Sequence, residues 1–72
     1  MQDVRIGKYR HFKGNEYIVL GIAKHSESLE EYVIYQALAE ERELWVRPKS
    51  MFLEKVNHAG KEIARFEYIG LI

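Results

Sequence analysis

Apolar residues divide the chain into short segments whose spacing is typical of β-strands. In the clearest segment, 16–24, Ile18, Leu20 and Ile22 would share one face of a strand, and the residues between them, most of them also apolar, would share the other. Because both faces are apolar, we expect a central strand that is covered on both sides. Gly21 predicts a bulge or a sharp bend within it.

Three more strands are predicted before and after this segment. A tight turn at 13–15, where glycine and asparagine tolerate positive φ, would join a strand at 8–12 to the central strand in a hairpin. Pro48 would end the next strand, because proline lacks a ladder donor, and would begin a short helical turn near 48–52. The three strands are expected at 8–12, 44–47 and 64–69, with a loop at 57–61.

The stretch 28–43 carries conflicting signals. Ser28, followed three residues later by Glu31, fits a capping box and favours a helix. Two aromatic residues around two β-branched residues, at 32–35, favour a strand instead. A short helix remains the alternative. The expected elements are a strand at 32–38 and a turn at 39–43.

Four or five short strands, one bent at a glycine, predict a mostly β fold. We expect one domain over residues 1–72, built as a small, partly open barrel, with Phe52, Leu53 and Val56 closing one end. The turn that Pro48 begins has a counterpart in SH3-like barrels, which serve here as an analogy. The chain contains no cysteine, so the core must hold this small fold without a disulfide.

Charge is balanced over the whole chain but not along it. Lysine and arginine together number 11, as do aspartate and glutamate, which argues against nucleic-acid binding through bulk charge. Residues 1–13 are mainly basic and residues 27–43 mainly acidic. These segments are expected to be solvated faces that attract each other, or else a bipolar surface that steers a partner. No secretory signal or bilayer-length apolar run is seen, so we expect a cytoplasmic protein outside the membrane.

An aromatic and basic group is the strongest candidate for function. Tyr9 and His11 would project from one face of the first strand, and Tyr35 and Trp45 would belong to a neighbouring hairpin. Arg47 would share the face of Trp45. Such residues are favoured on binding surfaces, so we expect a groove that recognises a protein or peptide partner. The alternative is that Tyr35 and Trp45 fill the core.

The triplet His25-Ser26-Glu27, after the central strand, suggests a different function. A small hydrolase or metal-dependent enzyme could use His11, His25 and Glu27, provided that the fold brings them together. No serine-hydrolase elbow or histidine pair with metal-ligand spacing supports this alternative. The triplet is more simply a polar loop that caps its own backbone, and Glu27 could pair with Arg47. No cofactor or metal is expected.

Single-stranded nucleic acid is a third, less favoured partner. Lys8, Arg10 and Lys13 interleave with Tyr9 and Phe12 in residues 8–13, and small barrels bind single strands by stacking and charge. The zero net charge weighs against this function. We expect a monomer or a weak homodimer, the latter by pairing of an open edge strand.

Five blocks of residues, in order along the chain, resemble a bacterial family known as domain of unknown function 1653. The resemblance covers roughly 7–56 and resumes at Arg65-Phe66, but it departs at 39–43, where a glycine-containing turn is expected. It implies a small bacterial stand-alone domain and leaves the chemistry open. The blocks are Gly7 to Tyr17, His25-Ser26-Glu27, Val33-Ile34-Tyr35, Trp45-Val46-Arg47-Pro48 and Met51-Phe52.

Overall fold

The computed structural model describes residues 4–39 and 42–71. In these residues strands predominate, and the one helix is a single turn, which confirms the prediction of a mostly β fold. The elements are β1 (Gly7–His11), β2 (Glu16–Lys24), β3 (Glu31–Ala37), β4 (Leu44–Pro48), α1 (Lys49–Phe52), β5 (Lys55–His58), β6 (Lys61–Ala64) and β7 (Phe66–Gly70).

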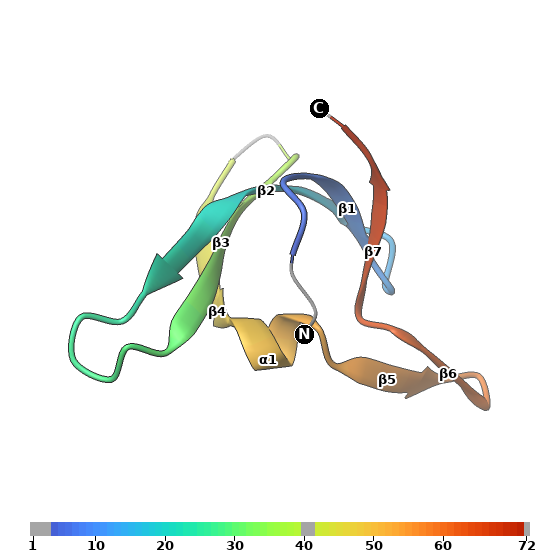
Figure 1. Ribbon diagram of the computed structural model, residues 1–72. Coiled ribbons are helices and arrows are strands. Elements are labelled where there is room, and N and C mark those ends of the chain that lie inside the picture. The colour runs from blue at the N-terminus through green and yellow to red at the C-terminus, as the bar shows by residue number, and fades with distance from the viewer. Residues whose placement is uncertain (1–3, 40–41, 72) are drawn as a thin grey trace.

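Within the described ranges, five strands form one antiparallel sheet in the order β4-β3-β2-β1-β7, and β5 and β6 form a separate two-stranded sheet. The large sheet arches, with β4 on one flank and β7 on the other (Figure 1). Helix α1 lies below the arch, and the β5–β6 hairpin projects away from it (Figure 1). Among the described residues β4 and β7 do not pair with each other, so the sheet does not close into a barrel.

Strand β2 has the predicted bounds and the predicted central place in the sheet. Its register against β3 shifts between Val19 and Gly21, which confirms the bulge. The prediction that both of its faces are covered was wrong. Val19 is fully buried, whereas Leu20 is 46% and Ile22 39% exposed. The reason is that α1 covers only the concave side of the sheet, and the β5–β6 hairpin does not fold over the convex side (Figure 1).

The conflict in 28–43 is resolved in favour of a strand, β3, which is hydrogen-bonded to β2 on one side and β4 on the other. Pairing on both sides outweighs the weak local preference for a helix. Ser28 does not cap a helix. Its Oγ accepts a hydrogen bond from the Glu30 amide within the β2–β3 loop. The turn predicted at 39–43 includes residues 40–41, which lie outside the described part of the chain.

The β5–β6 hairpin corrects the prediction of a loop at 57–61. Ala59 and Gly60 form its two-residue connection, both with positive φ, as a tight hairpin turn requires. The sequence gives little sign of these strands, because Val56 and Ile63, which face each other, are flanked almost entirely by polar residues. The last strand, predicted at 64–69, is present as β7 but begins at Phe66 and ends at Gly70, because Ala64 belongs to β6.

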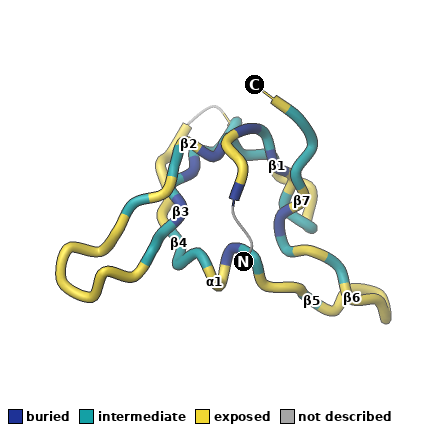
Figure 2. Tube along the Cα trace, in the orientation of Figure 1, coloured by how far each residue is buried: buried dark blue, intermediate teal, exposed yellow. Residues whose placement is uncertain are grey.

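The core is a cluster of aromatic and valine side chains, and α1 contributes Phe52 to it from the concave side of the sheet (Figure 1). Most of the buried positions are found on strands of the large sheet and on α1 (Figure 2). Phe52, which α1 carries, stacks on Phe66 with ring centroids 4.3 Å apart and a 6° angle between the rings. Leu53 packs against the same cluster, and Val56 is half-buried. The buried hydrophobic residues of the described part of the chain are Val4, Tyr9, Val19, Val33, Tyr35, Phe52 and Phe66. No helix in the described residues is long and apolar enough to cross a membrane.

Candidate functional site

The two tyrosines predicted to line a groove lie in the core instead. Tyr9 is 6% and Tyr35 5% exposed, and the rings of both contact Phe52 edge to face. The Tyr9 hydroxyl donates a hydrogen bond of 2.8 Å to the Arg5 carbonyl, while burial raises the pKa of that hydroxyl. Tyr9 and Tyr35 therefore support the concave face from within and are not available to a partner.

Trp45 and Arg47 remain accessible on β4, the edge strand. Trp45 faces the same side as its cross-strand neighbour Tyr35 but is 49% exposed, so it does not fill the core. Arg47 is half-buried. Its Nε donates to the Tyr35 hydroxyl at 3.3 Å, and its guanidinium carbon lies 5.6 Å from the centre of the Phe66 ring.

The partner suggested for Arg47, Glu27, is not its partner in the structure. Among the described residues, the Arg47 guanidinium pairs with no carboxylate, and its hydrogen bond goes to a neutral hydroxyl. Glu27 is exposed in the β2–β3 loop. Arg47 thus keeps a positive charge that its surroundings do not neutralise.

His11 ends β1 beside the same phenylalanine. Its ring contacts Phe66 edge to face at 5.0 Å, and its Nδ1 accepts a hydrogen bond from the Lys13 amide. Burial lowers the pKa of His11, and the positive charges of Arg65, Arg47 and Lys13 lower it further. His11 is therefore neutral at pH 7. It also lines a hollow of about 280 Å³ where the end of β1 meets β6 and β7.

Arg65 is a site residue that the reasoning from composition and pattern missed. It lies at the corner between β6 and β7, where its Nη2 pairs with Glu54 Oε1 at 2.8 Å. Its Nε is buried and has no hydrogen-bond partner in the described part of the chain. The only sign of it in the sequence is the short Arg65-Phe66 block of the family resemblance.

His11, Arg47 and Arg65 come from three separate parts of the chain and meet around Phe66. We call them the cationic cluster. Arg47 and His11 contact the Phe66 ring, Arg65 precedes it in the chain, and both arginines act electrostatically on His11. The residues predicted to line one groove are therefore not all accessible. Trp45, Arg47 and His11 are the accessible ones, and Arg47 and His11 lie against the core residue Phe66.

His25 and Glu27 lie away from this site. His11 lies beyond the first residue of β2 and His25 beyond its last, so the length of β2, about 30 Å for nine residues, separates them. The Nδ1 of His25 accepts hydrogen bonds from the amides of Glu27 and Ser28, both at 3.2 Å. His25 thus orders its own loop. In the described residues no three potential metal ligands cluster together.

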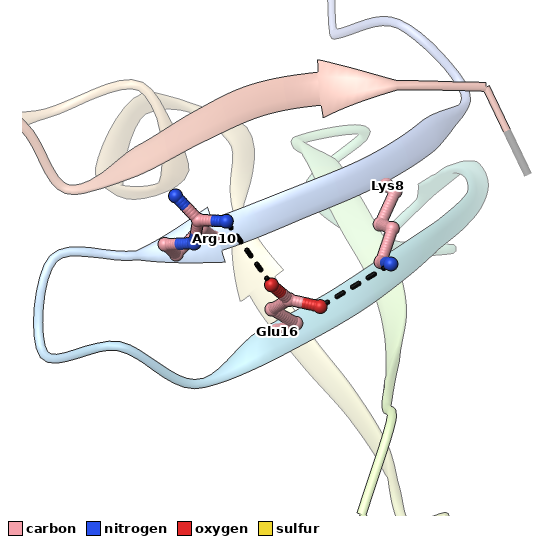
Figure 3. Close-up of polar contacts among 3 residues, drawn as sticks. All are labelled: Lys8, Arg10 and Glu16. Atoms are coloured by element: carbon pink, nitrogen blue, oxygen red, sulfur yellow. Dashed lines mark hydrogen bonds and ion pairs between the residues drawn. The ribbon is translucent and has the colours of Figure 1, made fainter.

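Two of the basic residues in 8–13 form ion pairs with the same carboxylate on the convex face. Lys8 and Arg10 both bind the carboxylate of Glu16, at 3.3 and 3.2 Å (Figure 3). Hydrogen bonds from Lys8 and then Arg10 lower the pKa of Glu16. Tyr9 points to the opposite, buried side. This segment therefore does not present the continuous surface of cations and aromatic rings that would bind single-stranded nucleic acid.

Comparison with known proteins places this architecture in a family. No curated protein matches the sequence. The crystal structure of a Bordetella bronchiseptica protein belonging to DUF1653 is similar, with a TM-score of 0.88 and 35% sequence identity over 100% of this chain and 95% of that one. The family described as "Protein of unknown function (DUF1653)" matches residues 7–68. The chain therefore belongs to the DUF1653 family, as its sequence blocks predicted.

Proposed function

We propose that the protein is a small binding module that takes an extended segment of another protein along the edge of β4. The observation that carries this proposal is the exposure of three consecutive large apolar residues on one edge strand. Leu44 is 64%, Trp45 49% and Val46 62% exposed. Edge strands of soluble proteins are usually protected by charged residues, proline or a covering segment, because their free backbone groups pair with other chains.

A peptide that adds a strand to a sheet gains affinity from backbone hydrogen bonds and specificity from side-chain contacts on both faces. Strand β4 offers apolar contacts of both kinds. Leu44 and Val46 face the convex side and Trp45 the concave side, because side chains alternate along a strand. The arched sheet with α1 on its concave side supports a partly open, SH3-like barrel, in which β4 forms one margin of the opening.

A segment of another protein is favoured over a second copy of this chain on grounds of charge. Arg47, on β4, has no carboxylate partner among the described residues. The sequence of β4, Leu-Trp-Val-Arg-Pro, contains no acidic residue, so pairing two β4 strands would not supply one within the new ladder. We expect the partner to carry an acidic residue near the position that faces Arg47.

The positions of the residues do not support the enzyme or the nucleic-acid alternative. The enzyme would need His11, His25 and Glu27 together, and the length of β2 separates the first from the other two. The nucleic-acid site would need Lys8 and Arg10 free, and both are bound to Glu16.

The test is selection from a library of random peptides, followed by a titration of the isotope-labelled protein with a selected peptide. We expect chemical-shift changes in the β4 amides and a rise of about tenfold or more in Kd for Trp45→Ala, since central aromatic residues dominate binding. Leu71→Ala is the matched control, because Leu71 is 82% exposed and outside β4. Selected peptides that leave the β4 amide signals unchanged and bind Trp45→Ala as tightly as the wild type would refute the proposal. Sedimentation showing that β4 pairs only with a second copy of this chain would also refute it.

A further inference from the structure

Two arginines and a histidine lie close to Phe66. Arg47 and His11 contact its ring, Arg65 precedes it in the chain, and the carboxylate of Glu54 binds Nη2 of Arg65. Glu67, which follows Phe66, faces Arg10 across the β1–β7 ladder. Arg47 has a hydroxyl as its hydrogen-bond partner, and the Nε of Arg65 is buried without one. Charges and donors that are shielded from water cost free energy unless an anion or acceptor accompanies them.

We propose that the cationic cluster of His11, Arg47 and Arg65 is a binding site for a carboxylate group, the acidic side chain or terminal carboxylate of the bound segment. This inference rests on the proposed function for the identity of the ligand, although the site itself is testable without a peptide.

Arg47 is the residue that would contact the carboxylate. Its Nε is held by the Tyr35 hydroxyl and its guanidinium lies over the Phe66 ring, so the group is oriented before a ligand arrives. The two Nη groups have no hydrogen bond in the described structure and can donate in parallel to the two oxygens of a carboxylate. Trp45 lies two residues before Arg47 on the same face of β4 and would pack against the neighbouring part of the segment.

His11 and Arg65 would act on the same anion in different ways. Arg65 supplies charge through space, because its Nε is buried and its Nη2 is bound to Glu54. His11 is neutral in the free protein because burial and the charges of Arg65, Arg47 and Lys13 disfavour its protonation. A bound carboxylate offsets those charges and favours the protonated imidazole. Arg10 and Glu67, which line the hollow beside His11, already face each other across the β1–β7 ladder.

Linkage then fixes the direction of the pH dependence. An anion that raises the pKa of His11 must bind more tightly as the pH falls through the pKa of His11 in the complex. The affinity for the carboxylate should therefore increase as the pH is lowered below neutrality, whereas the affinity of a site built from arginine alone would stay constant until the carboxylate itself is protonated.

The test uses acetate as the probe, with chloride at equal ionic strength as the baseline and inorganic phosphate as a second arm. In NMR titrations of the whole protein we expect acetate, beyond chloride, to shift the Arg47 side-chain signals in a saturable way and to move the His11 titration midpoint upward. Arg47→Gln should weaken acetate binding about tenfold or more. Lys24→Gln is the matched control and should bind as the wild type does, because Lys24 is exposed at the end of β2 that lies away from His11.

Equal responses to acetate and chloride, a response to phosphate alone, or unchanged acetate binding by a folded Arg47→Gln variant would overturn the inference. If acetate binds at Arg47 but no peptide engages β4, the carboxylate site stands and the proposed function fails. If peptides bind through Trp45 and Arg47→Gln has no effect on them or on acetate, the proposed function stands and the carboxylate site fails.

Discussion

Replacing Phe52 with alanine should destabilise the protein more than any other single change on α1. Phe52 is 2% exposed and is the buried residue of this helix. Its ring stacks on Phe66 and meets Tyr9 and Tyr35 edge to face, at centroid distances of 5.3 and 5.6 Å. Removing it would open a cavity between the helix and the sheet, which the rigid aromatic neighbours cannot fill.

The expected loss is large relative to the whole stability of a small domain. Truncation of a buried phenylalanine to alanine costs about 3–5 kcal/mol. A 72-residue protein has a free energy of unfolding of about 4–11 kcal/mol. Phe52→Ala should therefore remove about a quarter of the stability or more, and at the lower end of the stability range it would leave the variant close to unfolding at room temperature. Phe52→Leu fills part of the space and should lose less.

Urea denaturation followed by far-ultraviolet circular dichroism measures these differences. Met51→Ala is the matched control, since Met51 is the preceding residue of α1 and is 44% exposed. Its loss should stay below about 1 kcal/mol. A Phe52→Ala variant within 1 kcal/mol of the wild type, or Met51→Ala as damaging as Phe52→Ala, would mean that α1 does not seal the concave face of the sheet. If Phe52→Ala does not fold, Phe52→Leu provides the measurement.

Two further predictions concern the backbone and the surface. At Gly7, φ is +151° and an added Cβ would lie 2.7 Å from a carbonyl oxygen of β7. Gly7→Ala should therefore lower the free energy of unfolding by more than about 1 kcal/mol and lower Tm. Gly21→Ala is the control and should change Tm little, because there is open space around Gly21. An unaltered Tm for Gly7→Ala would contradict the close approach of β1 and β7. The lowered pKa of Glu16 means that its ion pairs stabilise the fold above the ordinary carboxyl value of 4.5, and that this contribution disappears as the pH falls through the lower, folded-state value. The small advantage of the wild type over Glu16→Gln should accordingly be seen in urea melts at pH 7, shrink in high salt and vanish in acid, and an advantage that persists in acid would show that the ion pairs are not its source.

Much of the large sheet could be predicted because its signals are local. A run of β-branched and aromatic residues marked β2 with its correct bounds, a glycine marked its bulge, and Pro48 marked the passage from β4 to α1. These features depend on backbone conformations that each residue type favours by itself. The β5–β6 hairpin lacked such signals, since one cross-strand pair, Val56 and Ile63, supplies most of its apolar character.

The candidate site could be predicted only in part, because burial depends on neighbours in space. Tyr35 and Trp45 face each other across the β3–β4 ladder, yet one is 5% and the other 49% exposed. Tyr35 has strands on both sides and Phe52 against its ring, whereas Trp45 lies on an edge strand beyond which no described residue adds another strand. No pattern in the sequence separates these two aromatic residues, and both were predicted to line the same groove.

The sequence by itself determined where most strands of the large sheet begin and end, to within about a residue, and to which family the chain belongs. Local conformational preference and the alternation of side chains are sufficient for these features. Only the tertiary structure decided that the sheet is covered on one side, and that His11, Arg47 and Arg65 gather around Phe66. The order of strands brings those three segments together, and strand order is set by packing over the whole chain, which no local stretch of residues encodes.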